Sequence, residues 1–170
     1  MMLVESARSD WDAFETSWNF TRPLILNIKS KTLLEKVVNT LRLQIQETIL
    51  TLKKIEEENN RILINAYGLQ YELTPEISFK EITLTCNPHY RYGGNRSEEE
   101  LETLLQCDTL KELVSYAIGC MMGRYSLDKP GLILASQGET VRDYLAQVPE
   151  PSFAPDKNAI IPLTDQEGFP

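Results

Sequence analysis

The chain has 170 residues, of which 42% are hydrophobic and 25% are charged, and its formal net charge is −8. This composition is typical of one soluble globular domain, and the acidic excess excludes a surface that is basic throughout, as extensive nucleic-acid binding would need. No apolar run approaches the roughly 18 residues that cross a bilayer, and no charged start precedes an apolar stretch as in a secretion signal, so we expect a cytoplasmic protein without membrane partners.

Residues 9–18 predict a short helix near the N-terminus. Trp11, Phe14 and Trp18 recur there at helical spacing and define one aromatic face. So short a helix cannot bury three large rings by itself. We therefore expect this face to pack either on the core of the chain or on a neighbouring domain.

A long helix is predicted from about Ser30 to Tyr67, where Gly68 is a favourable C-terminal cap. It carries a seam that alternates spacings of four and three, the repeat that keeps one stripe facing a partner helix. The seam consists of Leu34, Val38, Leu41, Ile45, Thr48, Leu52, Ile55, Asn59, Ile62 and Ala66. The pattern is equally consistent with packing inside the chain, a homodimer through the long helix, or a spacer that separates two domains.

The middle of the chain mixes extended and helical patterns. Residues 81–86 predict a strand or an extended segment, and residues 87–96 predict a loop that is rich in turn-forming residues. Two helices are expected at about 97–106 and 108–124, the first opening on a capping box. Glycines at 119 and 123, one helical turn apart, are expected to permit the close approach of another backbone.

The sequence therefore predicts a mainly α fold. A long coiled-coil-like helix packs with shorter helices, a few short strands or extended segments join them, and an irregular proline-rich tail ends the chain. We expect residues 1–148 to form a helical spacer module and residues 149–170 to form an extended linker or tail.

One segment resembles a catalytic motif. Asn87-Pro88-His89-Tyr90 is similar to the Asn-Pro-Pro-Tyr with which amino-methyltransferases present the target amine to the methyl donor. The third residue differs, and the glycine-rich turn that binds the cofactor is missing upstream, where Gly68 is the first glycine. We therefore expect no catalytic and no cofactor-binding residue, and interpret the segment as a loop.

The sequence also gives little support for a metal site or for a catalytic nucleophile. Cys86, Cys107 and Cys120 are widely spaced, and His89 is the only histidine, so no set of zinc ligands is predicted. Cys107 and Cys120 lie in apolar helical patterns, where a free cysteine acts as a small hydrophobic residue. We expect no metal site.

Two loops combine basic and aromatic residues, a composition that suits contact with phosphates and bases. In the alternative interpretation, the arginines pair with the abundant glutamates and the tyrosines cover the core. The candidate DNA-contacting residues are His89, Tyr90, Arg91, Arg96, Arg124 and Lys129.

Three stretches, residues 8–20, 84–93 and 115–132, resemble one family in the same order along the chain. Their most specific parts read Trp-Asp-Ala-Phe-Glu-Thr-Ser-Trp-Asn-Phe and Gly-Arg-Tyr-Ser-Leu-Asp-Lys-Pro-Gly. They are similar to segments of adenine-specific DNA methyltransferases of the BREX (PglX-like) phage-exclusion systems and of the related type IIG restriction-modification enzymes.

The resemblance implies a much longer parent enzyme that transfers a methyl group from S-adenosylmethionine to adenine N6. In it, a catalytic domain with the true Asn-Pro-Pro-Tyr lies upstream, and a target-recognition region lies downstream. This chain would be the helical spacer between them, inactive alone, without S-adenosylmethionine of its own, and in contact with the flanking domains and, through the parent, with DNA. The alternative is a free-standing coiled-coil protein that dimerises.

Overall fold

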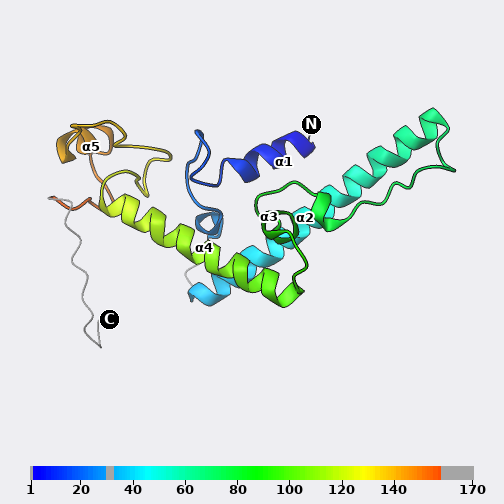
Figure 1. Ribbon diagram of the computed structural model, residues 1–170. Helices are drawn as coiled ribbons and strands as arrows, with labels where there is room; N and C mark the ends of the chain where they lie inside the picture. The colour runs from blue at the N-terminus through cyan, green and yellow to red at the C-terminus, as the bar shows by residue number, and fades with distance from the viewer. Residues whose placement is uncertain (1, 30–32, 158–170) are drawn as a thin grey trace.

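The computed structural model describes residues 2–29 and 33–157. These residues form helices joined by turns and irregular segments, and no strand occurs among them, which confirms the mainly α fold (Figure 1). In chain order the elements are α1 (Met2–Trp11), the 3-10 turn η1 (Leu24–Asn27), α2 (Leu34–Tyr67), the 3-10 turn η2 (Phe79–Glu81), α3 (Pro88–Tyr92), α4 (Glu98–Met121) and α5 (Val141–Gln147). No helix in this part of the chain is long and apolar enough to cross a membrane.

The N-terminal helix lies earlier than predicted. It ends at Trp11, and residues 12–18 form successive turns, in which Phe14 N–H and Ser17 N–H each donate to a carbonyl three residues back. These turns do not continue the helix. Phe14 is buried in the core, but Trp11 is half exposed and Trp18 is fully exposed, so only one of the three rings of the expected aromatic face packs on the core of the chain.

The first half of α2 supplies one wall of the main core. Its buried residues follow a helical stripe in which Ile49, rather than the predicted Thr48, faces inward. The stripe packs against Phe14, Ile82 and Leu84, which come from the segments before α2 and α3. The predicted end of the helix is confirmed, since Gly68 adopts a positive φ of 72°. Its predicted start falls partly on residues 30–32, which lie outside the described residues.

The second half of α2 extends beyond the core. Figure 1 shows residues 53–67 projecting from the body of the molecule, with residues 69–78 running back beside them. We call these two segments the arm. Ile62 and Leu63 are more than half exposed, so the outer part of the predicted seam has no partner helix among the described residues.

Side chains of α2 attach the returning segment to the helix. Lys53 Nζ donates to the carbonyl of Ile77 and to the Glu57 carboxylate, and that carboxylate accepts the Ile77 N–H at 3.3 Å. Farther out, Asn60 Nδ2 donates to the Pro75 carbonyl at 3.3 Å. The arm is therefore a two-segment element held by specific hydrogen bonds.

The two helices expected at 97–106 and 108–124 are one continuous helix, α4. Its predicted start is confirmed, because Ser97 and Glu100 form a reciprocal capping box. The break expected between residues 106 and 108 does not occur, and the helix continues through Asp108. The Asp108 carboxylate accepts a hydrogen bond from Tyr92 of α3, so it serves a tertiary contact.

An aromatic cluster packs at the C-terminal end of α4. The rings of Tyr116 and Tyr125 stack with centroids 5.0 Å apart, and Phe20 meets the Tyr125 ring edge-on at 5.4 Å. Gly119 makes room for the Tyr125 ring, because a Cβ atom there would lie 2.5 Å from a ring carbon. The expected close approach is thus made by an aromatic ring, while the Arg124 N–H donates to the Gly119 carbonyl at 2.8 Å.

The segment after α5 returns to the end of α4. Asp156 N–H donates to the Met121 carbonyl at 2.8 Å, and Ser152 N–H donates to the Asp128 carboxylate at 2.8 Å. Pro155 is buried beside Gly123. The first residues of the predicted tail therefore contact the helical body, and the predicted tail beyond residue 157 lies outside the described residues.

Candidate functional site

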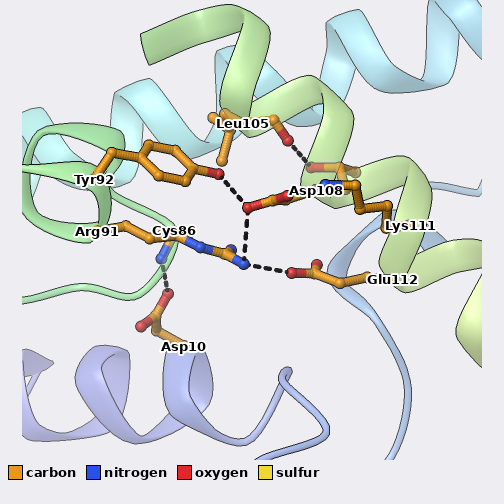
Figure 2. A network of polar contacts seen from close by, with 9 residues as sticks. Asp10, Cys86, Arg91, Tyr92, Leu105, Asp108, Lys111 and Glu112 are labelled. Atoms are coloured by element: carbon orange, nitrogen blue, oxygen red, sulfur yellow. Dashed lines mark hydrogen bonds and ion pairs between the residues drawn. The ribbon is translucent and has the colours of Figure 1, made fainter. Parts of the chain in front are cut away.

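A polar junction joins α3 to α4 next to the main core (Figure 2). The Arg91 guanidinium lies 2.9 Å from the Glu112 carboxylate and 3.5 Å from that of Asp108. Tyr92 donates its hydroxyl to the same Asp108 oxygen at 2.8 Å, and Lys111 approaches the second Asp108 oxygen at 3.1 Å. Two side chains from α4, Asp108 and Glu112, therefore bind two neighbouring side chains of the short helix α3, and Lys111 of α4 binds Asp108.

Aromatic rings complete the surroundings of Arg91. Its guanidinium carbon lies 5.2 Å from the centre of the Phe14 ring and 5.6 Å from that of the Tyr92 ring, distances at which a cation interacts with the face of a ring. With two carboxylates and two rings as neighbours, this guanidinium serves the fold. The interpretation in which the arginines pair with glutamates therefore describes Arg91.

A second connection joins α1 to the segment before α3. Asp10 is buried, and its two carboxylate oxygens accept the backbone N–H groups of Thr85 and Cys86 at 2.5 and 2.9 Å. These bonds replace the ladder that a strand at residues 81–86 would have formed. They hold Thr85 and Cys86 in a turn, in which the Asn87 N–H donates to the Leu84 carbonyl at 3.0 Å and from which α3 begins.

Asn87, the residue of the motif-like segment, is fully buried and uses its whole side chain for the fold. Its amide nitrogen donates to the Phe79 and Ile82 carbonyls, both at 2.7 Å, and its oxygen accepts the His89 N–H at 3.1 Å. Pro88 occupies the first position of α3, so Asn-Pro here marks the cap and start of a helix where a loop was predicted. An amide engaged in this way has no donor or acceptor free for a substrate base.

The balance between burial and the contacts in the polar junction shifts the pKa values of its two acids in opposite directions. Burial raises the pKa of Glu112, and the contact with Arg91 opposes this shift only in part. Burial also acts upward on the pKa of Asp108. The hydrogen bonds from Tyr92 and Lys111 and the charge of Arg91 outweigh it, so the pKa of Asp108 lies below its ordinary value. Asp108 is therefore the acid whose charge the junction stabilises.

We expect Asp108→Asn to destabilise the protein at pH 7 and to have progressively less effect as the pH falls below the ordinary carboxyl value of 3.8. Because folding lowers the pKa of Asp108, its contribution is complete above the unfolded value and is lost as the pH falls through the folded one. Urea unfolding at pH 7 and pH 3 measures this. Glu47→Gln, on the exposed face of α2, is the control, expected to stay within about 0.5 kcal/mol of the parent. A penalty for Asp108→Asn that is unchanged at pH 3 would contradict the assignment.

The six candidate DNA-contacting residues do not form one patch. Tyr90 and Arg96 are exposed near the start of α4, whereas Arg124 and Lys129 follow its end. A helix of this length spans about 36 Å at 1.5 Å per residue, so the two groups are well separated.

Several of these residues have partners within the chain. The His89 ring stacks on Phe79 with centroids 5.4 Å apart and lies 3.4 Å from Glu98. The Arg124 guanidinium lies over the Tyr125 ring at 5.4 Å, and Lys129 donates to Gln147 at 2.9 Å. Arg96 is exposed, but it is followed by the acidic first turn of α4, which disfavours phosphate there.

A groove of about 540 Å³ lies between α2, α4 and the start of α3. Exposed Leu43 and Leu50 line one side, and the paired side chains of Arg42 and Glu102 line the other. Within residues 2–29 and 33–157, no three His, Cys, Asp or Glu side chains come together as metal ligands. Cys120 is buried as predicted, but Cys107 is exposed, because it lies on the outer side of α4.

Reasoning from the sequence missed the acids that hold the site together. Asp10, Asp108 and Glu112 were not among the predicted site residues. One signal was present, because residues 108 and 112 are four apart and lie on one face of a helix. That spacing matches a pair of acids around one arginine, but the position of Arg91 depends on the tertiary fold.

No protein-family model matches the chain. Two known proteins, however, are similar to it in sequence over nearly its whole length. It is 33% identical over 180 aligned residues to the adenine-specific methyltransferase BrxX of Escherichia coli O9:H4 (strain HS). It is 34% identical over 171 aligned residues to the adenine-specific methyltransferase PglX of Lacticaseibacillus casei (strain Zhang). Both alignments include 98% of this chain, which spans only 14% of the length of BrxX and 12% of that of PglX. The chain therefore belongs to the BREX (PglX-like) family of adenine-specific methyltransferases, as the counterpart of one segment of its members.

Proposed function

We propose that this chain is a helical spacer segment of an adenine-specific DNA methyltransferase for phage defence, acting in the cytoplasm and unable to methylate DNA alone. The observation that carries the proposal is the similarity of nearly the whole chain to a small share of two proteins named as adenine-specific methyltransferases. The engagement of Asn87 with its own backbone supports it, since the motif-like segment has a structural role. S-adenosylmethionine would bind elsewhere in such an enzyme.

We assign the spacer role to the arm. Because residues 69–78 return along α2, the tip of the arm is not a point at which the chain passes on to a following domain. The arm would therefore set the distance between domains by lateral contact. Exposed Tyr67, Tyr71 and Leu73 at its outer end offer the apolar surface that such a contact needs.

Direct contact with DNA is the finer part of the proposal, and at Arg124, its strongest candidate, it is the alternative to the protein contact that we propose below. Arg124 is exposed, and no carboxylate pairs with it among the described contacts. Arg91 contributes by joining α3 to α4, so removing it would test folding more than DNA binding. With a net charge of −8, we expect few phosphate contacts and a shallow salt dependence of DNA affinity.

Shortening the arm tests the spacer role in the intact polypeptide that carries this chain. Deleting residues 61–64 together with 73–74 removes about 6 Å of helix and about 7 Å of extended chain, and it retains the turn at residues 68–72 and the bonds at Lys53, Glu57 and Asn60. We expect DNA binding to persist and transfer of labelled methyl groups to adenine to fall by at least about tenfold, because misplacement by ångströms is costly in catalysis.

Lys54→Ala, on the exposed side of the arm, is the matched control and is expected to leave methyl transfer unchanged. Full activity after the deletion would refute the spacer role. Methyl transfer by the 170-residue chain alone would refute the wider proposal.

The open seam of the arm favours a second candidate function, dimerisation. Ile55, Asn59, Ile62 and Ala66 lie on the side of α2 opposite the bonds to the returning segment, which is the side another helix would need. Light scattering decides between the two: a dimer that dissociates on Ile62→Lys supports this candidate, and a monomer at all concentrations excludes it.

A further inference from the structure

We propose that the surface around Trp18 is a docking site for another folded part of the same polypeptide. This surface consists of Thr16, Trp18, Asn19, Thr21, Arg124 and Leu132, which with their neighbours line a hollow of about 480 Å³. The inference rests on the proposed function in one respect, namely that the chain is part of a longer protein.

Trp18 is held in place although its ring is in solvent. The preceding residue, Ser17, is buried, donates its hydroxyl to Asp12 at 2.6 Å and accepts the Asn19 N–H at 3.2 Å. Two residues after Trp18, Phe20 is buried in the aromatic cluster. The backbone is therefore anchored on both sides of a fully exposed tryptophan. Because the backbone is already fixed, only the side-chain torsions of Trp18 lose freedom when its ring enters a complementary pocket, which favours binding.

The charges at this surface favour a protein over a nucleic acid. The one carboxylate of the hollow, Glu15, is already engaged, since its oxygens accept the Tyr125 hydroxyl at 2.7 Å and the Ser115 hydroxyl at 2.8 Å. Arg124 is the only cation that lines the hollow. Tryptophan and arginine with an uncharged rim are typical of the energetic centre of protein interfaces, whereas binding along a DNA backbone needs several cations.

The share of the relatives that this chain represents points to the partner. The chain spans 14% and 12% of the lengths of the two methyltransferases, so most of each relative lies outside the matching segment. Trp18 and Leu132 are left uncovered by the described residues of the chain itself. A neighbouring domain joined to the same chain is present at high effective concentration, which allows even a modest surface to stay occupied.

Hydroxyl-radical footprinting read by mass spectrometry tests this on the 170-residue chain and on the intact polypeptide that carries it. We expect Trp18 to be oxidised at least about tenfold more slowly in the intact polypeptide, as for a residue at the centre of an interface. Tyr144, which is fully buried, is the internal control and should react slowly in both. The protection should not depend on added DNA or on protein concentration.

Three results would overturn the proposal: equal oxidation of Trp18 in both proteins, protection that appears only with DNA, or protection of the 170-residue chain that grows with its concentration. The last two would assign the surface to nucleic acid or to a second copy.

Trp18→Ala provides a second measurement. It should leave the unfolding of the 170-residue chain unchanged but lower the Tm of the intact polypeptide, and an unchanged Tm there would also count against docking. Methyl transfer is assayed separately, so a failure of the proposed enzymatic role is distinguished from a failure of docking.

Discussion

Asn87→Ala is expected to lower the free energy of unfolding by about 3 kcal/mol, a large part of the total stability of a small domain. The substitution leaves the carbonyls of Phe79 and Ile82 without their donor and removes the cap of α3. Each buried group that loses its partner costs about 1–3 kcal/mol, and a lost cap costs about 1 kcal/mol. Urea unfolding followed by far-UV circular dichroism measures the loss.

Asn87→Asp separates the hydrogen bonds of this residue from its shape. The new carboxylate keeps the volume of the amide but turns an oxygen toward two carbonyls, so we expect it to destabilise the protein more at pH 7 than near pH 4. Asn39→Ala, at an exposed position of α2, serves as the matched control and should change stability by less than about 0.5 kcal/mol. Near-native stability of both Asn87 variants would show that this side chain does not organise the segment.

Gly119→Ala is expected to destabilise the protein by about 1–3 kcal/mol, the usual cost of overpacking a core. Helix propensity alone predicts the opposite sign, since alanine is favoured over glycine inside a helix by about 1 kcal/mol. Packing decides, because the new methyl group would lie 2.5 and 2.8 Å from two carbons of the Tyr125 ring. That ring is almost fully buried, stacks on Tyr116 and donates its hydroxyl to Glu15, so it cannot move away freely.

A double-mutant cycle isolates this contact. In the background of Tyr125→Ala the ring is absent, and Gly119→Ala should then stabilise the protein through helix propensity. A change of sign between the two backgrounds is the expected result, measured by urea unfolding of the four variants. Stabilisation by Gly119→Ala in the native background would contradict the close contact.

The helical core was the most predictable part of the fold. The end of α2 at Gly68 and the start of α4 at Ser97 follow from capping, which acts within a few residues. The first half of α2 was recognisable by its apolar stripe. Among residues 2–29 and 33–157, the predicted continuation of that stripe as a seam has no partner helix beyond Leu52, because periodicity shows which side of a helix is apolar but not where its partner ends.

The candidate site was less predictable, since its groups are brought together over long distances in sequence. Asp10 meets the N–H groups of Thr85 and Cys86, which lie 75 and 76 residues away. Arg91, a predicted DNA contact, meets Glu112 across 21 residues. The sequence does not distinguish a charged residue that faces solvent from one that faces a buried partner. Only the packing of α1, α3 and α4 distinguishes these two environments.

By itself the sequence determined the helical class, the ends of the helices that carry strong caps, and the resemblance to one methyltransferase family, because all of these depend on residues close together along the chain. The tertiary structure alone decided that Asn87 serves the backbone, that Arg91 is paired with Glu112 and Asp108, and that Trp18 is left in solvent while Phe14 is buried. Burial and electrostatic pairing depend on which distant segments pack around a side chain, and local patterns do not contain that information.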